Sequence, residues 1–250
     1  MIYYFSGNGN SRWVAEQIAA ATNDAVENIS DYINNKKELR CPSPEDKRVG
    51  IVFPIHSWYA PQPVIDFVDK LQLNADTYRY MVCTCGDDAG KAAFRFRRHF
   101  KFDAAWSVRM PNTYIPMFDL DSDTVARIKV QEAREKIKEI AEDVNACKKK
   151  VRDVFEGAFP YTKTYVVNYL FYKFTVTSKG FTVNDSCISC GNCRDACPVN
   201  NIHLVDGRPT WADNCIHCMA CIHTCPQRSI DFKTATKKRG RYLLKRYIQR

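Results

Sequence analysis

A twelve-residue cysteine pattern occurs twice in this chain, and the two copies lie 28 positions apart. They begin at Cys187 and Cys215, and each reads C-x2-C-x2-C-x3-C-P. In such a run the close triplet of thiolates ligates three irons of a cubane [4Fe-4S] cluster, and the fourth thiolate ligates the other cluster. The two predicted ligand sets are Cys187, Cys190, Cys193 and Cys225 for one cluster, and Cys215, Cys218, Cys221 and Cys197 for the other. The pattern therefore predicts one-electron redox chemistry.

Two other interpretations of these cysteines fit the sequence less well. A zinc ribbon pairs C-x2-C units and has no use for a third close cysteine or for the trailing proline. A disulfide framework needs an oxidising compartment. The chain begins with MIYYF, without the basic and apolar regions of a signal peptide, and it has no apolar run of about 18 residues. We therefore expect a soluble protein in the cytoplasm.

Residues 181–235 resemble the bacterial-type ferredoxins with two four-iron clusters, and the register of the two copies continues to Ile202 and Ile230. The resemblance implies a small α+β domain. Such a domain needs only about 55–60 residues, because metal replaces much of the apolar core. The remainder of the 250 residues is long enough for an independent domain. The expected parts are a first domain over 1–150, an aromatic helical linker over 151–180, the cluster domain over 181–235 and a basic tail over 236–250.

The first domain opens with a strand, a small polar loop and a helix. Ile2–Phe5 is apolar, and the apolar residues of Arg12–Ala21 recur at helical spacing. The loop between them consists of Ser6, Gly7, Asn8, Gly9, Asn10 and Ser11. Its backbone N–H groups and the following helix N-terminus favour an anion. The loop has no lysine, which excludes a nucleotide-triphosphate P-loop, and it breaks the dinucleotide G-x-G-x-x-G pattern. The alternative is a glycine-rich turn without a ligand.

This loop resembles the phosphate loop of the flavodoxins, in which hydroxyl and amide groups surround the phosphate of FMN. Asn8 and Ser11 stand where flavodoxins commonly carry threonine, and both keep a polar side chain. The resemblance implies FMN as a cofactor. It also implies a flavodoxin-like, doubly wound α/β fold whose five-stranded parallel sheet has the order 2-1-3-4-5.

Strands and helices alternate along the rest of this domain, which independently favours a parallel, doubly wound sheet. The expected strands are Val26–Ile29, Val49–Pro54, Tyr80–Cys85 and Ala104–Met110, and the expected helices are Gln62–Leu71, Ala89–Phe100 and Asp123–Lys150. The polar stretch Ser30–Lys47 is expected to be a loop. Ligands of such sheets bind beyond the carboxyl ends of the strands.

Two more loops are expected to meet the phosphate loop at that edge. They contain Pro54, Ile55, His56, Ser57, Trp58 and Tyr59 in the second loop, and Thr84, Cys85, Gly86, Asp87 and Gly90 in the third. Flavodoxins enclose the isoalloxazine ring with loops at these places. The resemblance therefore implies that Trp58 or Tyr59 stacks on the ring, and that Cys85 and Gly86 lie along its edge. In the alternatives, Trp58 is an exposed aromatic residue and the acidic residues after Gly86 form a turn or a helix cap.

Nearly the whole chain resembles a fusion family of anaerobes, in which a flavodoxin-like domain precedes a two-cluster ferredoxin domain. Met110–Asn112 and Gly240–Tyr242 look like further recurring segments of that family. The resemblance implies electron transfer. The implied partners are donor and acceptor proteins of the ferredoxin, hydrogenase or flavoenzyme class.

The linker carries aromatic residues at helical spacing, namely Tyr161, Tyr165, Tyr169, Tyr172 and Phe174. The favoured interpretation is a helix whose aromatic stripe packs the two domains together. The alternative is a helix that lies on a membrane surface.

The formal net charge is +9, and residues 236–250 carry seven cationic residues and no acidic one. We expect this tail to fold back on the chain or to dock on an acidic redox partner, with contact to anionic lipid as an alternative. Nucleic acid is not an expected partner, because no binding motif is recognisable. His217 and His223 are expected at the surface, with tuning of cluster potentials as the alternative. Of the four remaining cysteines, Cys85 belongs to the third loop, and the other three are expected to be ordinary thiols, namely Cys41, Cys83 and Cys147.

Three functions fit these features. In the favoured one, the chain passes electrons between FMN, which holds one or two electrons, and the clusters, each of which passes one. In the second, the clusters supply a flavin that reduces a small molecule. In the third, the chain is a redox sensor whose basic tail binds a target. No nicotinamide-binding domain is recognisable, so direct oxidation of NAD(P)H is not expected.

Overall fold

A parallel sheet of six strands forms the N-terminal half of the computed structural model, which describes residues 1–39 and 47–249. The strands are β1 (Ile2–Tyr4), β2 (Val26–Asn28), β3 (Arg48–Pro54), β4 (Tyr78–Cys85), β5 (Ala104–Arg109) and β6 (Val151–Asp153). Their order is β2-β1-β3-β4-β5-β6, and each neighbouring pair is parallel. The reversal of strand order beside β1 places a switch point between β1 and β3, which is where ligands of doubly wound sheets bind.

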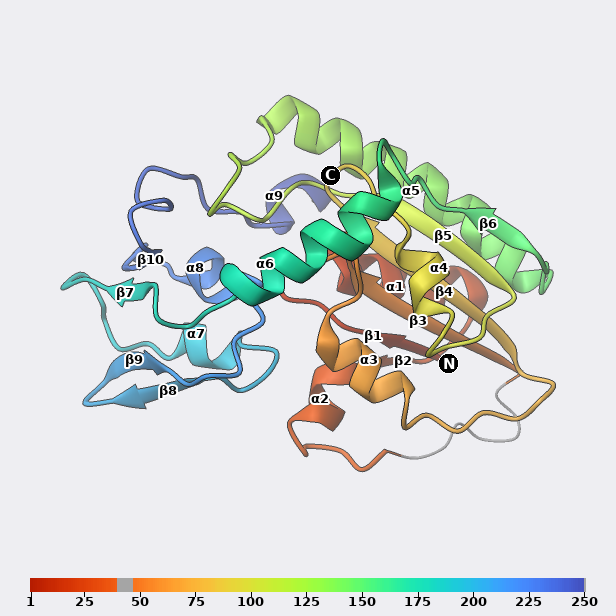
Figure 1. Cartoon of the computed structure of the whole chain (residues 1–250), viewed down its shortest axis with the longest axis horizontal. Helices are drawn as coiled ribbons and strands as arrows, with labels where there is room; N and C mark the ends of the chain where they lie inside the picture. The colour runs from red at the N-terminus through yellow and green to blue at the C-terminus, as the bar shows by residue number, and fades with distance from the viewer. Residues whose placement is uncertain (40–46, 250) are drawn as a thin grey trace.

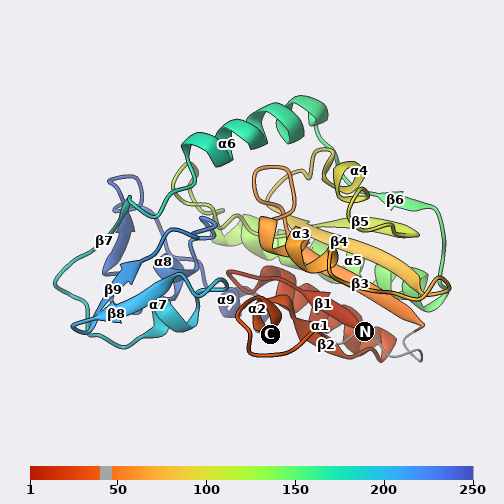
Figure 2. The same cartoon turned by 60° about the horizontal axis from the view of Figure 1, so that its bottom comes forward.

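The two faces of the sheet follow from the alternation of side chains along each strand. On one face, Val52 and Val82 pack against helices α1 (Asn10–Thr22) and α5 (Asp123–Asn145). On the other, Ile51 and Phe53 pack against α2 (Ile29–Ile33), α3 (Gln62–Val68) and α4 (Ala92–Phe96). Figures 1 and 2 show the resulting three layers. All four of these strand side chains are fully buried.

The sheet leaves no room for a side chain at Gly50, because the ring of Tyr80 lies against it. A Cβ atom on Gly50 of β3 would lie 2.3 Å from the ring of Tyr80 on β4. Tyr80 is fully buried, and its ring also contacts Trp106 of β5 edge-on. The absence of a side chain at Gly50 therefore makes room for this aromatic pair within the core.

The structure confirms the flavodoxin-like order 2-1-3-4-5 and adds β6 as a sixth strand, just past the expected domain boundary. The loop expected over Ser30–Lys47 is wrong in its first part, because α2 begins at Ile29 with Asn28 as its N-cap. The Asn28 side chain accepts a hydrogen bond from the backbone N–H of Ser30 at 3.0 Å. The rest of that stretch includes Cys41, which lies outside the described residues. Of the helix expected over Ala89–Phe100, only Ala92–Phe96 forms a regular α-helix (α4). The helix expected over Asp123–Lys150 ends earlier, at Asn145 (α5).

The C-terminal half is a small α+β domain with two two-stranded antiparallel sheets. Its elements are β7 (Phe181–Val183) paired with β10 (Ile230–Phe232), β8 (Ile202–Val205) paired with β9 (Arg208–Trp211), and the short helices α7 (Asn192–Asp195) and α8 (Ala220–Thr224). The hairpin between β8 and β9 turns at Asp206 and Gly207, which both have positive φ. Ile202 and Ile230, the equivalent isoleucines of the two sequence copies, are both buried in the core of this domain.

The two domains share their cores. Val199, from the cluster domain, is buried in the apolar core on the face of the sheet that also contains Tyr3 and Phe5. Ile115, from the loop after β5, is fully buried in the core of the cluster domain. This reciprocal exchange of apolar side chains fixes the domains against each other through the hydrophobic effect.

The linker is a continuous helix, with a π-helical start η1 (Thr162–Val167) and an α-helical end α6 (Asn168–Phe174). It runs from the sheet domain to the cluster domain (Figure 1). The packing expected for its aromatic stripe is wrong for Tyr161, Tyr169 and Phe174, which are exposed. Tyr165 and Tyr172 are partly buried. The buried positions are the polar residues Thr164 and Asn168. No helix of the described residues is both long and apolar enough to cross a membrane.

The C-terminal segment returns to the start of the chain. Tyr242 is buried and donates a hydrogen bond from its hydroxyl to Asn10 Oδ1 at 2.7 Å. Leu244 packs against the core beside α1, and α9 (Lys245–Ile248) follows along α5. Arg241 is buried and pairs with Asp231 at 2.9 Å. Part of the basic tail therefore folds back and binds to the rest of the chain. The last residue, 250, lies outside the described residues.

Candidate iron–sulfur and flavin sites

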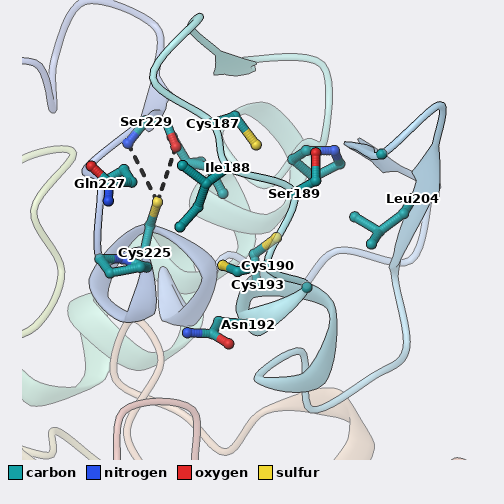
Figure 3. A pocket seen from close by; sticks show the side chains of 15 residues that line it. Cys187, Ile188, Ser189, Cys190, Asn192, Cys193, Leu204, Cys225, Gln227 and Ser229 are labelled. Carbon is teal, nitrogen blue, oxygen red and sulfur yellow. Dashed lines mark hydrogen bonds between the residues drawn. The ribbon is translucent and has the colours of Figure 1, made fainter.

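One predicted ligand set surrounds a single cavity. Cys187, Cys190, Cys193 and Cys225 all line it, and Cys225 comes from the second copy of the cysteine pattern (Figure 3). Ser229 donates its backbone N–H to Cys225 Sγ at 3.3 Å, and its hydroxyl lies 3.1 Å from the same sulfur. Such hydrogen bonds stabilise negative charge on a thiolate. Cys225 of the second copy therefore lines the same cavity as the triplet of the first, which is the grouping that the crosswise prediction requires.

The second ligand set lies deeper in the protein. Burial, together with repulsion from the neighbouring Cys197 and Cys215, raises the pKa of Cys218 to about 12. The same Cys197 also acts on Cys221, so the fourth cysteine of the first copy lies beside the triplet of the second. Buried thiols of this kind bind iron only as thiolates, and the charge of the metal reverses the effect of burial on the pKa.

The described residues contain no group of three or more His, Cys, Asp or Glu side chains arranged around a single metal ion. Four cysteine sulfurs line the cavity of Figure 3.

The two sets differ in exposure and in what they face. In the first set, Cys190 is exposed and the neighbouring Ile188 is 60% exposed, so this cavity lies at the surface. In the second set, Cys218 lies against the sheet domain. A Cβ atom on Gly7 would be 3.0 Å from Cys218 Cβ and 3.3 Å from its sulfur. Asn8 Nδ2 donates a hydrogen bond to the Cys218 carbonyl at 2.8 Å. We call the two positions the outer and the inner cluster site.

The loop over residues 6–11 keeps the features of an anion cradle. Gly9 has φ +92°, and α1 starts at the next residue. Within the described residues, the backbone N–H groups of Gly7, Asn8, Asn10 and Ser11 donate to no protein acceptor. The Gly9 N–H donates to Ser6 Oγ at 3.1 Å and closes the turn. Four free N–H groups at a helix N-terminus fit a phosphate group.

The side chains of this loop mostly have other roles. Ser11 Oγ lies 2.7 Å from Thr84 Oγ1 and so joins the first loop to the third. Asn10 donates to the Pro111 carbonyl at 3.1 Å and accepts from Tyr242. A phosphate would therefore be held mainly by the backbone, and the side chains would hold the loop in shape.

The second and third loops meet beneath the linker helix. Trp58 of the second loop has φ +61° and lies beside Gly90 of the third loop. A Cβ atom built on Gly90 would be 3.2 Å from Trp58 Cβ. Thr164 of the linker lies at the same point: its hydroxyl donates to the Trp58 carbonyl at 3.2 Å and accepts from Lys91 N at 2.8 Å. Asn168 donates to the carbonyls of His56 and Ser57, at 3.3 and 2.8 Å. The linker helix therefore covers both loops.

The acidic residues of the third loop have separate roles. Asp88 accepts a hydrogen bond from Gly90 N at 3.2 Å and pairs with Lys163 of the linker at 2.6 Å, so it acts as a turn cap and as an anchor. Asp87 is exposed. Lys129 of α5 is buried and donates to the Gly86 carbonyl at 2.8 Å and to Asp121 at 2.9 Å. Sequence patterns could not reveal Lys129, because it stands on a charged helix among other lysines.

Tyr59 and Cys85 are buried rather than presented at an open surface. The guanidinium of Arg95 lies 3.9 Å from the centre of the Tyr59 ring, which is a cation–π contact. Burial raises the pKa of the Cys85 thiol to about 12, and the charges of Asp88 and Asp87 act in the same direction. Cys85 is therefore an unreactive, protonated thiol at neutral pH.

The expectation that His217 and His223 lie at the surface is wrong, because both are buried. Tyr242 N donates to His223 Nδ1 at 3.0 Å, so the proton of the neutral ring is on Nε2, which donates to the Thr113 carbonyl at 2.8 Å. His217 Nδ1 lies 2.8 Å from the Tyr114 hydroxyl. Burial lowers the pKa of each histidine to about 4, so both are neutral at pH 7. Each histidine joins the cluster domain to the loop after β5.

Several buried polar atoms near these loops have no partner among the described residues. They are Asn8 Oδ1, Ser57 Oγ, Tyr59 Oη, Tyr172 Oη and His217 Nε2. His56 lies close enough to His217 for the two charges to interact, and burial followed by this repulsion lowers the pKa of His56 to about 4. Buried polar atoms normally have partners, so unpaired ones around the domain boundary fit a polar ligand there. Together with the free N–H groups of residues 6–11, they fit a flavin with a phosphate tail.

Comparison with known proteins identifies one part of the chain by sequence. Residues 181–230 match the family model of the 4Fe-4S dicluster domain. No curated protein matches the chain. The chain thus joins a domain of flavodoxin-like topology to a 4Fe-4S dicluster domain.

Several solved structures of flavoproteins are similar to part of the chain at low identity. A putative flavoprotein from Bacteroides uniformis has 15% identity and a TM-score of 0.37, over 44% of this chain and 88% of that chain. An FMN-dependent NADH-azoreductase from Bacillus anthracis, solved with FMN, has 10% identity and a TM-score of 0.35, over 58% and 98%. An NAD(P)H:quinone oxidoreductase from Methanothermobacter marburgensis has 13% identity and a TM-score of 0.36, over 56% and 94%.

Proposed function

We propose that this protein carries electrons between a redox partner and a bound FMN, through two [4Fe-4S] clusters held in order. The observation that carries the proposal is the contact of Cys218, an inner-cluster ligand, with Gly7 and Asn8 of the phosphate loop. The outer site lies at the surface and the inner site against the flavin loops. This order supports a path from partner to outer cluster, to inner cluster, to flavin.

Each cofactor has its own set of protein groups. The outer cluster would be held by Cys187, Cys190, Cys193 and Cys225, and the inner cluster by Cys215, Cys218, Cys221 and Cys197. The backbone of residues 6–11 would hold the flavin phosphate, and the loops that contain His56 and Gly86 would hold the ring. When bound, FMN supplies a group that exchanges one or two electrons, while each cluster exchanges one.

The residues around the predicted flavin loops favour a carrier over a reductase of small molecules. Thr164 and Asn168 hydrogen-bond to the second loop, and Lys163 pairs with Asp88 of the third, so the linker helix closes this edge of the loops. A small substrate would need the helix to move aside. Electron transfer through protein needs no such opening. Turnover with small electron acceptors that is as fast as reduction of a partner protein would support the reductase instead.

The proposal is tested first by the cofactors of the anaerobically purified protein. About one FMN and about eight irons per chain are expected. Protein without flavin would remove the first domain from the electron path, and protein without iron would remove the second.

A pair of variants tests the contact that carries the proposal. Gly7→Ala places a Cβ atom 3.0 Å from Cys218 Cβ. The control is Ile128→Ala, at a position on α5 that is 51% exposed. After rapid reduction of the clusters, flavin reduction followed by absorbance should slow several-fold in Gly7→Ala, and the spectrum of one cluster should shift. Ile128→Ala should behave as the parent protein does. Equal rates in both variants would contradict a path through this contact.

A further inference from the structure

We propose that the outward face of the linker helix binds the surface of an anionic phospholipid bilayer. This face consists of Phe159, Tyr161, Val166, Tyr169, Leu170 and Phe174, and we call it the aromatic face. These side chains are between 44% and 78% exposed. The inference concerns where the protein is held, and it does not depend on the proposed electron path.

The aromatic face is not an unpacked part of the core. The inner side of the helix is already bound: Thr164 is fully buried, Asn168 is buried, and Arg95 donates to the Thr164 carbonyl and to Asn168 Oδ1, both at 3.0 Å. Val166, Leu170 and Phe174 follow one another at i,i+4 spacing on the opposite side. Phe171 also packs inward, against Tyr114 and His217. The helix thus already has its contacts with the protein on the inner side, and the apolar side chains of the outer side are left exposed. Contiguous apolar surface of this kind marks an interaction site.

The charges around this face fit a negatively charged surface. Residues 157–184 contain three lysines and no aspartate or glutamate. Lys163 pairs with Asp88, whereas Lys173 and Lys179 have no ion pair among the described residues. The Lys173 ammonium lies 5.6 Å from the Tyr169 ring and 5.3 Å from the Phe174 ring, beside the apolar side chains. Tyrosine, phenylalanine and lysine together are typical of helices at the boundary between lipid headgroups and acyl chains.

A redox protein is a poorer occupant of the aromatic face. The helix separates this face from the second and third loops, and a helix with its side chains is about 10 Å across. A docked redox protein would be held at that distance from the flavin loops. The surface at Cys190 and Ile188 offers closer approach to a cluster. Attachment to a bilayer does not require closeness to the flavin loops, and it leaves the outer cluster site free.

The test is flotation of the cofactor-loaded full-length protein with vesicles. We expect the protein to float with vesicles that contain phosphatidylglycerol and to float much less with pure phosphatidylcholine. Leu170→Ser combined with Phe174→Ser should weaken binding about tenfold or more, because two buried apolar contacts are lost. The matched control is Ile128→Ser on α5, which removes an apolar side chain that is 51% exposed elsewhere on the protein. It should bind as the parent does.

A second arm separates the aromatic face from the basic tail. Lys173→Gln with Lys179→Gln should weaken binding to the anionic vesicles severalfold, whereas Lys237→Gln with Lys238→Gln in the exposed tail should change it little. Iron content and the circular dichroism spectrum report whether each variant is folded. No flotation of the parent protein, or flotation that depends on the tail and not on the aromatic face, would overturn the proposal. Unchanged flotation with slower reduction by a partner protein would overturn it in favour of protein docking.

Discussion

The two halves of this molecule are stabilised in different ways. The sheet domain has apolar side chains packed on both faces, with Ile51, Phe53 and Trp106 fully or almost fully buried. The cluster domain has one small apolar core, and Cys193 and Cys221 are part of it. Its strands are only three or four residues long. The sheet domain is therefore stabilised by the packing of its own side chains, whereas the fold of the cluster domain depends on its metal.

Removal of iron should give the largest difference in stability between the two domains. Anaerobic chelation should abolish amide-exchange protection in β7, β10 and the β8–β9 hairpin, because the metal–thiolate bonds hold these short strands together. Protection in β3 and β4 should persist. Exchange measured by mass spectrometry at the level of peptides checks both. Equal loss of protection in the two domains would show that the sheet domain depends on the metal as much as the cluster domain does.

Pairs of ligand substitutions should remove one cluster or both, depending on whether the pair crosses between the cluster sites. Cys225→Ser with Cys190→Ser affects only the outer site, so about four irons per chain should remain. Cys225→Ser with Cys218→Ser affects both sites and should leave almost none. Iron analysis distinguishes them, and Cys147→Ser, at an exposed thiol outside both sets, is the control. If the first pair lost all iron and the second kept half, the crosswise assignment would be wrong.

A core substitution in the sheet domain should give the opposite pattern. Ile51→Ala removes a fully buried side chain and should lower the free energy of unfolding of this domain by about 2–5 kcal/mol. The iron content should stay the same in the folded protein. Urea unfolding followed by tryptophan fluorescence measures the first quantity. Ile128→Ala, at an exposed position, should change it by less than about 0.5 kcal/mol.

The smallest expected effect is a pH dependence in the sheet domain. Burial raises the pKa of Cys85 from its ordinary 9.0 to about 12, so above pH 9 the unfolded chain loses this proton while the folded chain keeps it. Stability should therefore fall by about 1.4 kcal/mol for each pH unit between these values. Cys85→Ser removes this loss. The difference in unfolding free energy between variant and parent should shift in favour of the variant from pH 8 to pH 10, and a constant difference would show that the thiol is not buried in solution.

The sequence predicts most of the fold, because the alternation of apolar residues in strands such as β3 and β4 is strong. The cysteine spacing predicts which cysteines share a site. The linker follows its sequence pattern less well. A stripe of aromatic residues at helical period ordinarily marks a buried face, but here the fully or almost fully buried positions are Thr164 and Asn168. Their importance depends on carbonyl groups of the second loop, which no sequence pattern reports.

The buried histidines were missed for a similar reason. The surroundings of His217 and His223 come from the loop after β5 and from the C-terminal segment, more than 100 residues away in one case and 19 in the other. Between cluster ligands, a histidine in sequence looks like any polar surface residue. The rings are covered by residues distant in sequence, including Phe232 beside His217, so their role can be found from the fold but not from the spacing.

The hydroxyl of Tyr242 and the side chain of Leu244 close over a loop that begins at the sixth residue of the chain. The ribosome makes Asn10 of this loop 232 residues before it makes Tyr242. In a growing chain the N–H groups of residues 6–11 therefore lack this cover until the cluster domain, which precedes Tyr242, has been synthesised.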